Sequence, residues 1–328
     1  MQAPLVINVQ AMSLNTLFQN LGEREAATAP FVGGKFVSLC RLFEAGVSVP
    51  PAICLTTEAF SIMTDKIGSA PLVVNLIDSQ YGERYGESVE ISKEVSSRIR
   101  SAPMPAMIRD SLGTRLSTLA FPLIVRSSAT HEDSSNRSFA GIFESVLGVN
   151  SVDETLEAIK ECWASLFSEK VIAYSKSDVS FFESCKMAVI CQEMLNPSVG
   201  GVAFTWDPIK GESVFTINSS WGIPSLLVSG EIVPDLYELG KDGTMLHRKR
   251  GSKRWTCEFA NGRLKTRPAT TSEQQHYSLS DRQLREIYHC GKRIESVFCA
   301  PQDIEWAIQG DHLYVLQSRA ITTIIGTP

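Results

Sequence analysis

Long apolar runs are missing from this sequence, and so is a basic segment ahead of an apolar one at the amino terminus. A membrane-spanning helix needs about 20 consecutive apolar residues, and a secretory signal joins a charged start to an apolar core. The eight cysteines form no Cys-x-x-Cys pair, and Cys40 and Cys191 lie in apolar patterns where a reduced thiol packs as a small hydrophobe. We therefore expect a cytoplasmic protein with reduced cysteines and no membrane partner.

An excess of positive charge is also missing, because 31 Lys and Arg face 36 Asp and Glu, for a net charge of −5. Proteins that bind nucleic acid through its phosphates usually present a basic surface, so we expect no nucleic-acid partner. Residues 241–267 are an exception, with nine basic residues and two acids. A solvated hairpin with scattered charges is the favoured interpretation, and a polyphosphate or nucleic-acid patch is the alternative. Only Trp255 and Phe259 could stack on bases there.

What the sequence does contain is an apolar fraction of 43% over 328 residues, enough for one large or two medium folding units. The apolar run Phe121 to Val125 predicts a buried strand. It leads to Arg126 and a predicted loop of small hydroxyl residues, namely Ser127, Ser128, Thr130, Ser134 and Ser135. Small side chains let N–H groups approach an anion, and a guanidinium adds matching charge. This chemistry suits a polyphosphate; a polar surface loop is the alternative.

Two glycines, Gly33 and Gly34, precede a segment with helical apolar spacing, and Gly46 stands where a helix often ends. A glycine turn before a helix gathers free N–H groups, and Lys35 adds a mobile positive charge. Further along, the capping boxes Ser151–Glu154 and Ser280–Gln283 predict two more helix starts. The run 187–194 predicts a buried strand.

Residues 303–308 and 312–319 predict the two strands of a hairpin. A two-residue turn at Gly310 and Asp311 would place Glu305 opposite Leu316. A three-residue loop that includes His312 pairs Glu305 with Gln317, and we favour it because it separates polar from apolar side chains. That register pairs Trp306 with Leu316 and Ile308 with Tyr314, and it puts Leu313 and Val315 on the face of Gln317 and Arg319.

The polar face of this hairpin offers a carboxylate, an amide oxygen and a guanidinium. Mg²⁺ in phosphoryl-transfer sites takes hard oxygen ligands, which Glu305 and Gln317 could supply, and Arg319 could reach phosphates beside them. From these residues alone, a solvated polar face of an ordinary amphipathic hairpin is the favoured interpretation.

Four separated segments occur in one order along the chain: 31–60 with its Gly-Gly-Lys, the Arg126 segment, 201–208, and 302–322. Together they resemble the ATP-grasp nucleotide-binding domain of the pyruvate phosphate dikinase and phosphoenolpyruvate synthase family. Rifampin phosphotransferase and the glucan water dikinases carry similar domains. The resemblance implies an α/β fold of the ATP-grasp type in two lobes, with ATP and Mg²⁺ between them. We expect residues 1–190 to form the amino-terminal lobe and residues 191–328 the carboxyl-terminal lobe.

The resemblance also implies roles for individual residues. Catalytic roles fall to the three cations at the phosphates, namely Lys35, Arg126 and Arg319. The backbone at Gln192, Glu193 and Met194 would contact the edge of the adenine ring. Metal binding falls to Glu305 and Gln317. Residues 138–141, ending at Gly141, would form part of a loop that closes over the phosphates, and Glu144 follows that loop.

The chain departs from the family pattern at three positions. Gly222-Ile-Pro-Ser225 stands where Gly-Leu-Gly-Glu is usual, His131 replaces an alanine, and Ala320 replaces a proline. Loss of the glutamate at Ser225 could alter ribose recognition or catalysis, and an imidazole beside phosphates could donate or accept a proton.

The expected function is that of an ATP-dependent phosphotransferase. The resemblance implies transfer of the β-phosphoryl, which gives AMP, to a histidine carrier on a separate domain or protein. The alternatives are a stand-alone kinase with a small-molecule acceptor, an ATP-grasp ligase, and a nucleotide-binding module with weakened catalysis.

Overall fold

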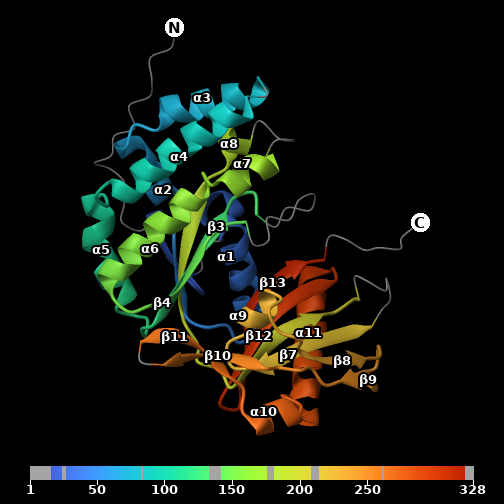
Figure 1. Ribbon diagram of the computed structural model, residues 1–328. Helices are drawn as coiled ribbons and strands as arrows, with labels where there is room; N and C mark the ends of the chain where they lie inside the picture. The colour runs from blue at the N-terminus through green and yellow to red at the C-terminus, as the bar shows by residue number, and fades with distance from the viewer. Residues whose placement is uncertain are drawn as a thin grey trace.

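Two antiparallel sheets with helices around them make up the protein (Figure 1). A computed structural model describes residues 16–23, 27–82, 84–132, 142–175, 181–207, 214–260 and 262–321. The predicted α/β class is confirmed. The helices are α1 Ala29–Glu44, α2 Thr57–Lys66, α3 Ala70–Tyr81, α4 Tyr85–Ser101, α5 Ala106–Leu116, α6 Val152–Ser165, α7 Glu169–Ser175, α8 Phe181–Ser184, α9 Ser225–Val228, α10 Thr271–Gln275 and α11 Asp281–Phe298.

The first sheet has five strands in the order β1-β2-β5-β3-β4. Helix α6 packs on one face and α1 on the other, so alternate residues of each central strand enter different cores. In β5, Val189 joins the core beneath α6, whereas Ile190 joins the core around α1. The strands are β1 Phe18–Asn20, β2 Ala52–Leu55, β3 Leu123–Ala129, β4 Ser145–Val149 and β5 Met187–Glu193.

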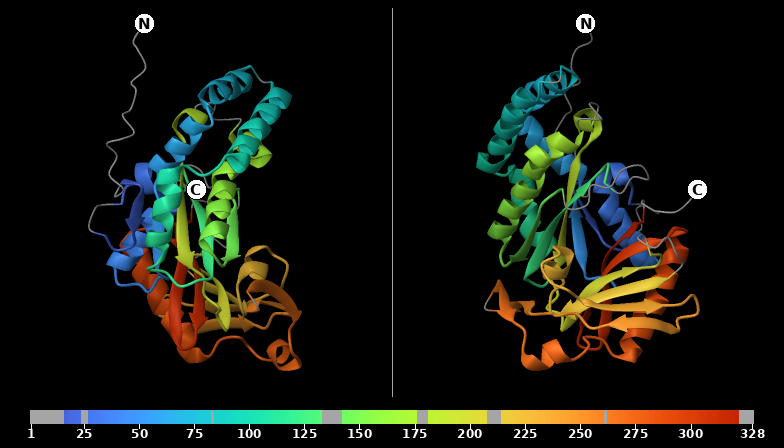
Figure 2. Two further views of the ribbon diagram at one scale, coloured as in Figure 1. Left: turned by 90° about the vertical axis from the view of Figure 1, so that its left-hand side faces the viewer. Right: turned by 45° about the vertical axis from the view of Figure 1, so that its right-hand side comes forward.

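The second sheet has six strands in the order β13-β12-β6-β7-β8-β9, and helix α11 packs against it (Figure 2). Strands β10 and β11 form a separate hairpin. The strands are β6 Val199–Phe204, β7 Phe215–Trp221, β8 Asp235–Leu239, β9 Met245–Lys249, β10 Trp255–Ala260, β11 Arg263–Pro268, β12 Gln302–Gln309 and β13 His312–Ala320.

Helix α1 lies in the part of the sequence that forms the first sheet, but its apolar residues pack in one buried cluster with residues of the second sheet. Phe36 and Leu39 of α1 pack in one buried cluster with Trp306 of β12 and Ile287 of α11. The chain passes from the first sheet to the second between Glu193 and Val199. The division into lobes at 190/191 stays a prediction, since the apolar core runs across it.

The β12–β13 hairpin corrects the predicted loop but keeps the predicted polar pair. Gln309 pairs with His312, so the turn has two residues, and Gly310 supports it with a φ of 63°. A bulge between Glu305 and Trp306 then restores the register, so that Glu305 does lie opposite Gln317.

The bulge also changes which side chains share a face. Trp306 pairs with Val315 and Ile308 with Leu313, not with Leu316 and Tyr314 as expected. Leu313 and Val315 therefore enter the core, whereas Gln317 and Arg319 line a cavity on the other side. The physical reason is that one extra residue in a strand reverses its alternation.

The predicted helix starts are mostly found. Ser280 and Gln283 form the expected reciprocal capping box at α11. At α6 the Ser151 side chain accepts from the Glu154 N–H, but the Glu154 carboxylate accepts from the Asn150 N–H. Helix α1 ends at Glu44 and Gly46 follows with a φ of 68°, as predicted.

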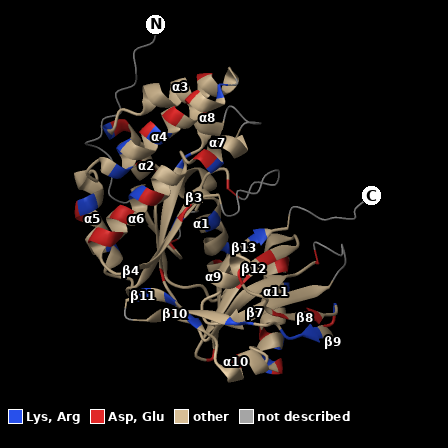
Figure 3. Cartoon of the chain, in the orientation of Figure 1, with Lys and Arg blue, Asp and Glu red and all other residues tan. Residues whose placement is uncertain are grey.

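Charged residues of both signs occur over the helices, whereas β9 and β11 carry Lys and Arg and no acidic residue (Figure 3). All five residues of β9 are exposed, which agrees with the favoured hairpin interpretation of this segment. Among the helices in the described part of the chain, none has the length and apolar composition required to cross a membrane.

Candidate functional site

A cavity of about 610 Å³ lies between the two sheets. Strands β3, β4 and β5 line it from the first sheet, and β12 and β13 line it from the second. Eight of the predicted site residues line this one cavity, namely Lys35, Arg126, Gln192, Glu193, Met194, Glu305, Gln317 and Arg319. The ninth, Gly141, lies outside the described residues, as do its neighbours in the predicted closing loop.

Arg126 spans the cavity between the two sheets. It lies within β3 and not in a loop, because the strand continues to Ala129. Its Nη1 donates to the Leu316 carbonyl oxygen at 2.9 Å, and its Nη2 donates to the amide oxygen of Gln317. Both partners are uncharged, so the buried guanidinium keeps its full positive charge at the cavity wall.

Of the hydroxyl residues predicted to form an anion loop after Arg126, Ser127 and Ser128 lie in the strand instead, whereas Ser134 and Ser135 lie outside the described residues. Ser127 and Ser128 are fully buried within β3, and Ser128 Oγ donates to the Val32 carbonyl oxygen at 2.7 Å. The Phe36 N–H donates to the same hydroxyl, so this N–H is not available to bind a phosphate. Gly33, with a φ of 72°, allows this close approach, because a Cβ there would lie 2.0 Å from the Ser128 carbonyl oxygen.

Lys35 is fixed by two oxygens of the first sheet and its connecting turn. Its Nζ lies 2.7 Å from Glu132 Oε1 and 3.2 Å from the Ser127 carbonyl oxygen. Glu132 also lines the cavity. Sequence analysis assigned no role to Glu132. Its position shortly after Arg126 was the feature that could have identified it as a cavity residue.

Arg319 and the two predicted metal ligands lie side by side on β12 and β13. Arg319 donates through Nε and Nη2 to Asp303 Oδ2, at 2.9 and 2.6 Å. Glu305 and Gln317 are partners in register, and no hydrogen bond of the Glu305 carboxylate is found within the described residues. In those residues no group of three or more His, Cys, Asp or Glu side chains is arranged to hold a metal.

The end of β5 forms another wall of the cavity, and its side chains are already engaged. Gln192 Nε2 donates to the Pro50 carbonyl oxygen at 3.2 Å, and Glu193 Oε1 accepts from the Ala120 N–H at 2.8 Å. The N–H groups of Glu193 and Met194 also donate to main-chain oxygens. The next residue, Leu195, lines the cavity, and its N–H has no hydrogen-bond acceptor among the described residues. It was missed by sequence analysis.

Apolar side chains from both sheets also line the cavity, namely Ile124, Phe143, Leu147, Ile223 and Leu316. Strand pairing places Ile124 between Gln192 of β5 and Leu147 of β4. Ser225 also lines the cavity. It stands at the position where the family that this sequence resembles usually has a glutamate. An apolar slot with a few polar groups at one end is typical of small-molecule sites.

His131 and Glu144 do not line this cavity. His131 Nε2 lies 3.4 Å from Ser184 Oγ, and its ring packs on Phe181 with centroids 5.9 Å apart. Glu144 is exposed. An imidazole acting directly on phosphates is therefore not supported by the geometry.

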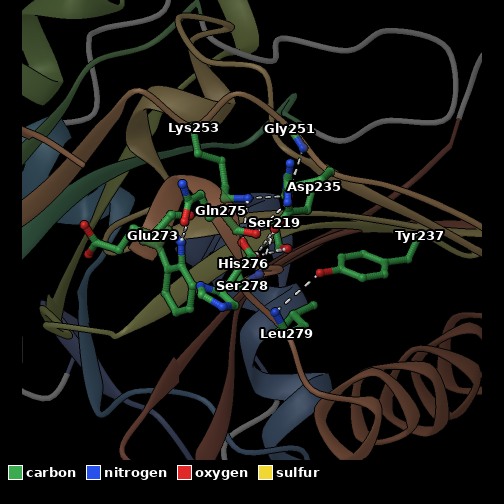
Figure 4. A network of polar contacts seen from close by, with 12 residues as sticks. Ser219, Asp235, Tyr237, Gly251, Lys253, Glu273, Gln275, His276, Ser278 and Leu279 are labelled. Atoms are coloured by element: carbon green, nitrogen blue, oxygen red, sulfur yellow. Dashed lines mark hydrogen bonds and ion pairs between the residues drawn. The ribbon is translucent and has the colours of Figure 1, made fainter. Parts of the chain in front are cut away.

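A second polar cluster lies outside the cavity, in the second sheet. Figure 4 shows Lys253, Gly251 and Ser278 around the Asp235 carboxylate. Lys253 and Asp235 are fully buried and form an ion pair. Burial, with the Asp235 charge adding to it, raises the pKa of the nearby Tyr237 to about 12. Lys253 belongs to the basic segment, so the predicted scatter of solvated charges is wrong for this residue.

Two antiparallel sheets around a cleft that is lined by three cations and by apolar side chains agree with a nucleotide-binding domain of the ATP-grasp class. The particular family follows from comparison with known proteins. The family described as pyruvate phosphate dikinase, AMP/ATP-binding domain, matches residues 29–326. The chain belongs to this family, and ATP binding is the property that the family describes.

Curated relatives agree with this assignment. The chain is 31% identical to a probable phosphoenolpyruvate synthase of Methanothermobacter thermautotrophicus, over 94% of this chain and 46% of the relative. It is 29% identical to a rifampicin phosphotransferase of Bacillus subtilis, over 96% of this chain and 37% of the relative. The chain thus spans less than half the length of these relatives.

Among solved structures, the chain is similar to the D-alanine–D-alanine ligase of Helicobacter pylori. The TM-score is 0.38 and the identity 10%, over 88% of this chain and 53% of that one. A likeness at this level adds no support to the assignment.

Proposed function

We propose that this chain binds Mg-ATP in the cleft and donates the β-phosphoryl group to a histidine carried by a separate domain or protein. The observation that supports this most directly is the meeting of Lys35, Arg126 and Arg319 at one cavity. These cations come from three distant segments, and only a polyanion would use them together.

The apolar slot would take the adenine, and the end of β5 would read its edge. The free donor there is the N–H of Leu195, because those of Glu193 and Met194 are engaged within the protein. The N–H that would donate to the adenine edge is therefore that of Leu195, in place of the N–H of Met194. Ile124 and Leu147, which strand pairing places in a row with Gln192, would pack against the ring.

The three cations would bind the phosphates and stabilise the charge that develops during transfer. Phosphoryl transfer needs little covalent help from a protein, so positioning and electrostatics supply most of the acceleration. Arg126 is suited to this role because neutral oxygens hold its fork in place without cancelling its charge.

The oxygens of Glu305 and Gln317 fit the Mg²⁺ that this family is expected to use. A carboxylate and an amide oxygen are hard ligands, and Mg²⁺ commonly takes one or two protein oxygens together with water and phosphates. When bound, the ion would neutralise phosphate charge. Glu305 would hold it together with Gln317, whose amide oxygen accepts from Arg126 Nη2 and has a second lone pair for the ion. Arg319 beside them would bind the phosphates directly.

A histidine nitrogen of the carrier forms a bond to the β-phosphorus, and the bond from that phosphorus to the oxygen it shares with the α-phosphate breaks. AMP leaves with that oxygen. The β- and γ-phosphoryls move together to the carrier, and attack of water on the γ-phosphorus would then release inorganic phosphate and leave the β-phosphoryl on the histidine.

Phosphorus NMR of the purified chain with Mg-ATP tests the proposal. Without a partner we expect ATP to bind and no AMP to form at a catalytic rate. Adding the remainder of the Methanothermobacter relative as a separate chain should start AMP release, and Arg319→Ala should slow it by about 10²–10³. Undiminished turnover by that variant would refute the role of Arg319.

Other products would point to the alternatives. AMP with a phosphorylated small molecule, formed without any partner, would contradict the carrier and indicate a stand-alone kinase. ADP with a new amide would indicate a ligase. ATP binding without turnover under every condition would indicate a binding module.

A further inference from the structure

Lys35 faces the cavity with one of its three N–H donors left over. An ammonium has three donors, and two of them are taken by the Glu132 carboxylate at 2.7 Å and the Ser127 carbonyl oxygen at 3.2 Å. Both acceptors belong to the end of β3 and the turn after it. The direction of the remaining N–H is therefore set by the first sheet, although Lys35 itself lies on α1.

Glu132 is held as firmly as the lysine that it binds. Its side chain is 2% exposed, against 13% for that of Lys35. The Glu132 N–H donates to the Ala129 carbonyl oxygen, and its Oε2 accepts from the Ala129 N–H at 3.2 Å. The turn thus folds back on the strand and fixes the carboxylate from both ends.

A buried carboxylate in a cleft that takes an anion needs an explanation, because it repels the phosphates that the cleft attracts. Burial of a charge is also costly unless it is paired. Orientation offers an explanation, because a lysine without a fixed partner loses side-chain freedom when it binds a phosphate, whereas a lysine that is already held does not, so the pair would strengthen phosphate binding. A small misplacement of a phosphate-binding group can also cost about 10²-fold in rate.

We propose that Glu132 is a positioning residue that aims the ammonium of Lys35 at the phosphates of the bound nucleotide. This inference rests on the proposed function for the identity of the ligand. Glu132 acts through Lys35: its carboxylate and the Ser127 carbonyl take two donors, and the third is left for a phosphate oxygen.

Affinities for ATP and AMP, measured by calorimetry, separate aiming from a merely structural role. AMP shares the base and sugar but lacks the outer phosphates. We expect Glu132→Ala to weaken ATP binding several-fold and to leave AMP binding unchanged. Glu132→Gln keeps one of the two acceptor oxygens and should lose less ATP affinity than Glu132→Ala. A general loosening of the turn would lower both affinities together.

A stricter test asks whether the effect of Glu132→Ala on ATP affinity depends on the presence of Lys35. In a Lys35→Met background, Glu132→Ala should cause no further loss of ATP affinity, because the group that it aims is gone. Glu161→Gln, which removes a half-exposed carboxylate paired with Arg100, is the matched control and should change neither affinity.

A chemical measurement decides the inference even without nucleotide. Acetylation of lysines by acetic anhydride, followed by mass spectrometry, should modify Lys35 several-fold faster in Glu132→Ala than in the unaltered chain, while the exposed Lys170 reacts equally in both. Unchanged labelling of Lys35 and unchanged ATP affinity in Glu132→Ala would overturn the inference. A chain that binds no ATP, yet shows the faster labelling, would overturn the proposed function and the aim at phosphates, and would leave only the holding of Lys35 by Glu132.

Discussion

Arg126 Nη1 donates to the Leu316 carbonyl oxygen at 2.9 Å, across 190 positions of sequence. Arg126 belongs to the five-stranded sheet and Leu316 to the six-stranded sheet, so this hydrogen bond ties the two walls of the cleft together. A side chain with this geometry both joins the sheets and presents its charge to the ligand.

Arg126→Lys should lower the rate of AMP formation by about 10²-fold, because an ammonium cannot reproduce the planar fork that contacts Leu316 and Gln317. Arg115→Lys, on the far side of the first sheet from the cleft, serves as the control. Initial rates with the carrier present provide the measurement, and equal rates for both variants would show that the fork is dispensable.

Glu305→Gln should raise the Mg²⁺ concentration needed for half-maximal activity, because a neutral amide is a weaker ligand for a hard cation. We expect a change of about tenfold or more, with partial recovery at high Mg²⁺. Asp311→Asn, at the turn of the same hairpin, should behave like the unaltered chain. A Mg²⁺ dependence that is the same in all three proteins would count against Glu305 as a ligand.

Lys253→Met should destabilise the protein by about 3–5 kcal/mol, because it leaves the Asp235 carboxylate charged and buried without its partner. The double variant with Asp235→Asn should recover part of this loss. Urea unfolding gives both values, and the exposed Lys249→Met is the control. Stability equal to that of the unaltered chain in Lys253→Met would show that the ion pair of Figure 4 contributes nothing.

Glu273 makes stability depend on pH in the acid range. Hydrogen bonds from the Arg267 side chain hold the pKa of Glu273 at about 2, below its ordinary value of 4.5. Because the folded-state pKa is depressed, this stabilisation is complete above about pH 4.5 and is lost as the pH falls toward 2. Glu273→Gln should therefore cost about 1 kcal/mol at neutral pH, and the difference from the unaltered chain should shrink between those values. Unfolding curves at several pH values measure this, and a difference that is constant with pH would be inconsistent with it.

Residues named from the sequence lie together around one cavity. Lys35, Arg126 and Glu305 stand in local patterns, namely a glycine turn, an apolar run and an alternating hairpin, whereas Gln192 was named through the resemblance. Local patterns are readable because the residues that form them are neighbours in the chain. The opposition of Glu305 and Gln317 was also predicted, although for the wrong turn.

The structure corrected predictions that depended on contacts between distant segments. Ser127 and Ser128 were expected in a phosphate loop, but pairing with β5 keeps them in a strand. Lys253 was expected in solvent, but Asp235 and the His276 carbonyl oxygen draw it into the interior. Neither partner could be identified from the residues around the position.

The sequence by itself determined the class of the protein and the kinds of side chain at the cleft, because hydrophobic periodicity and motif order are properties of the chain. Tertiary structure decided how those side chains are held and which remain available. The bulge in β13 turned Gln317 and Arg319 toward the cavity, and Glu132 met Lys35 only because α1 packs against β3. Hydrogen bonds across such long sequence separations are set by packing, for which the order of residues carries no local signal.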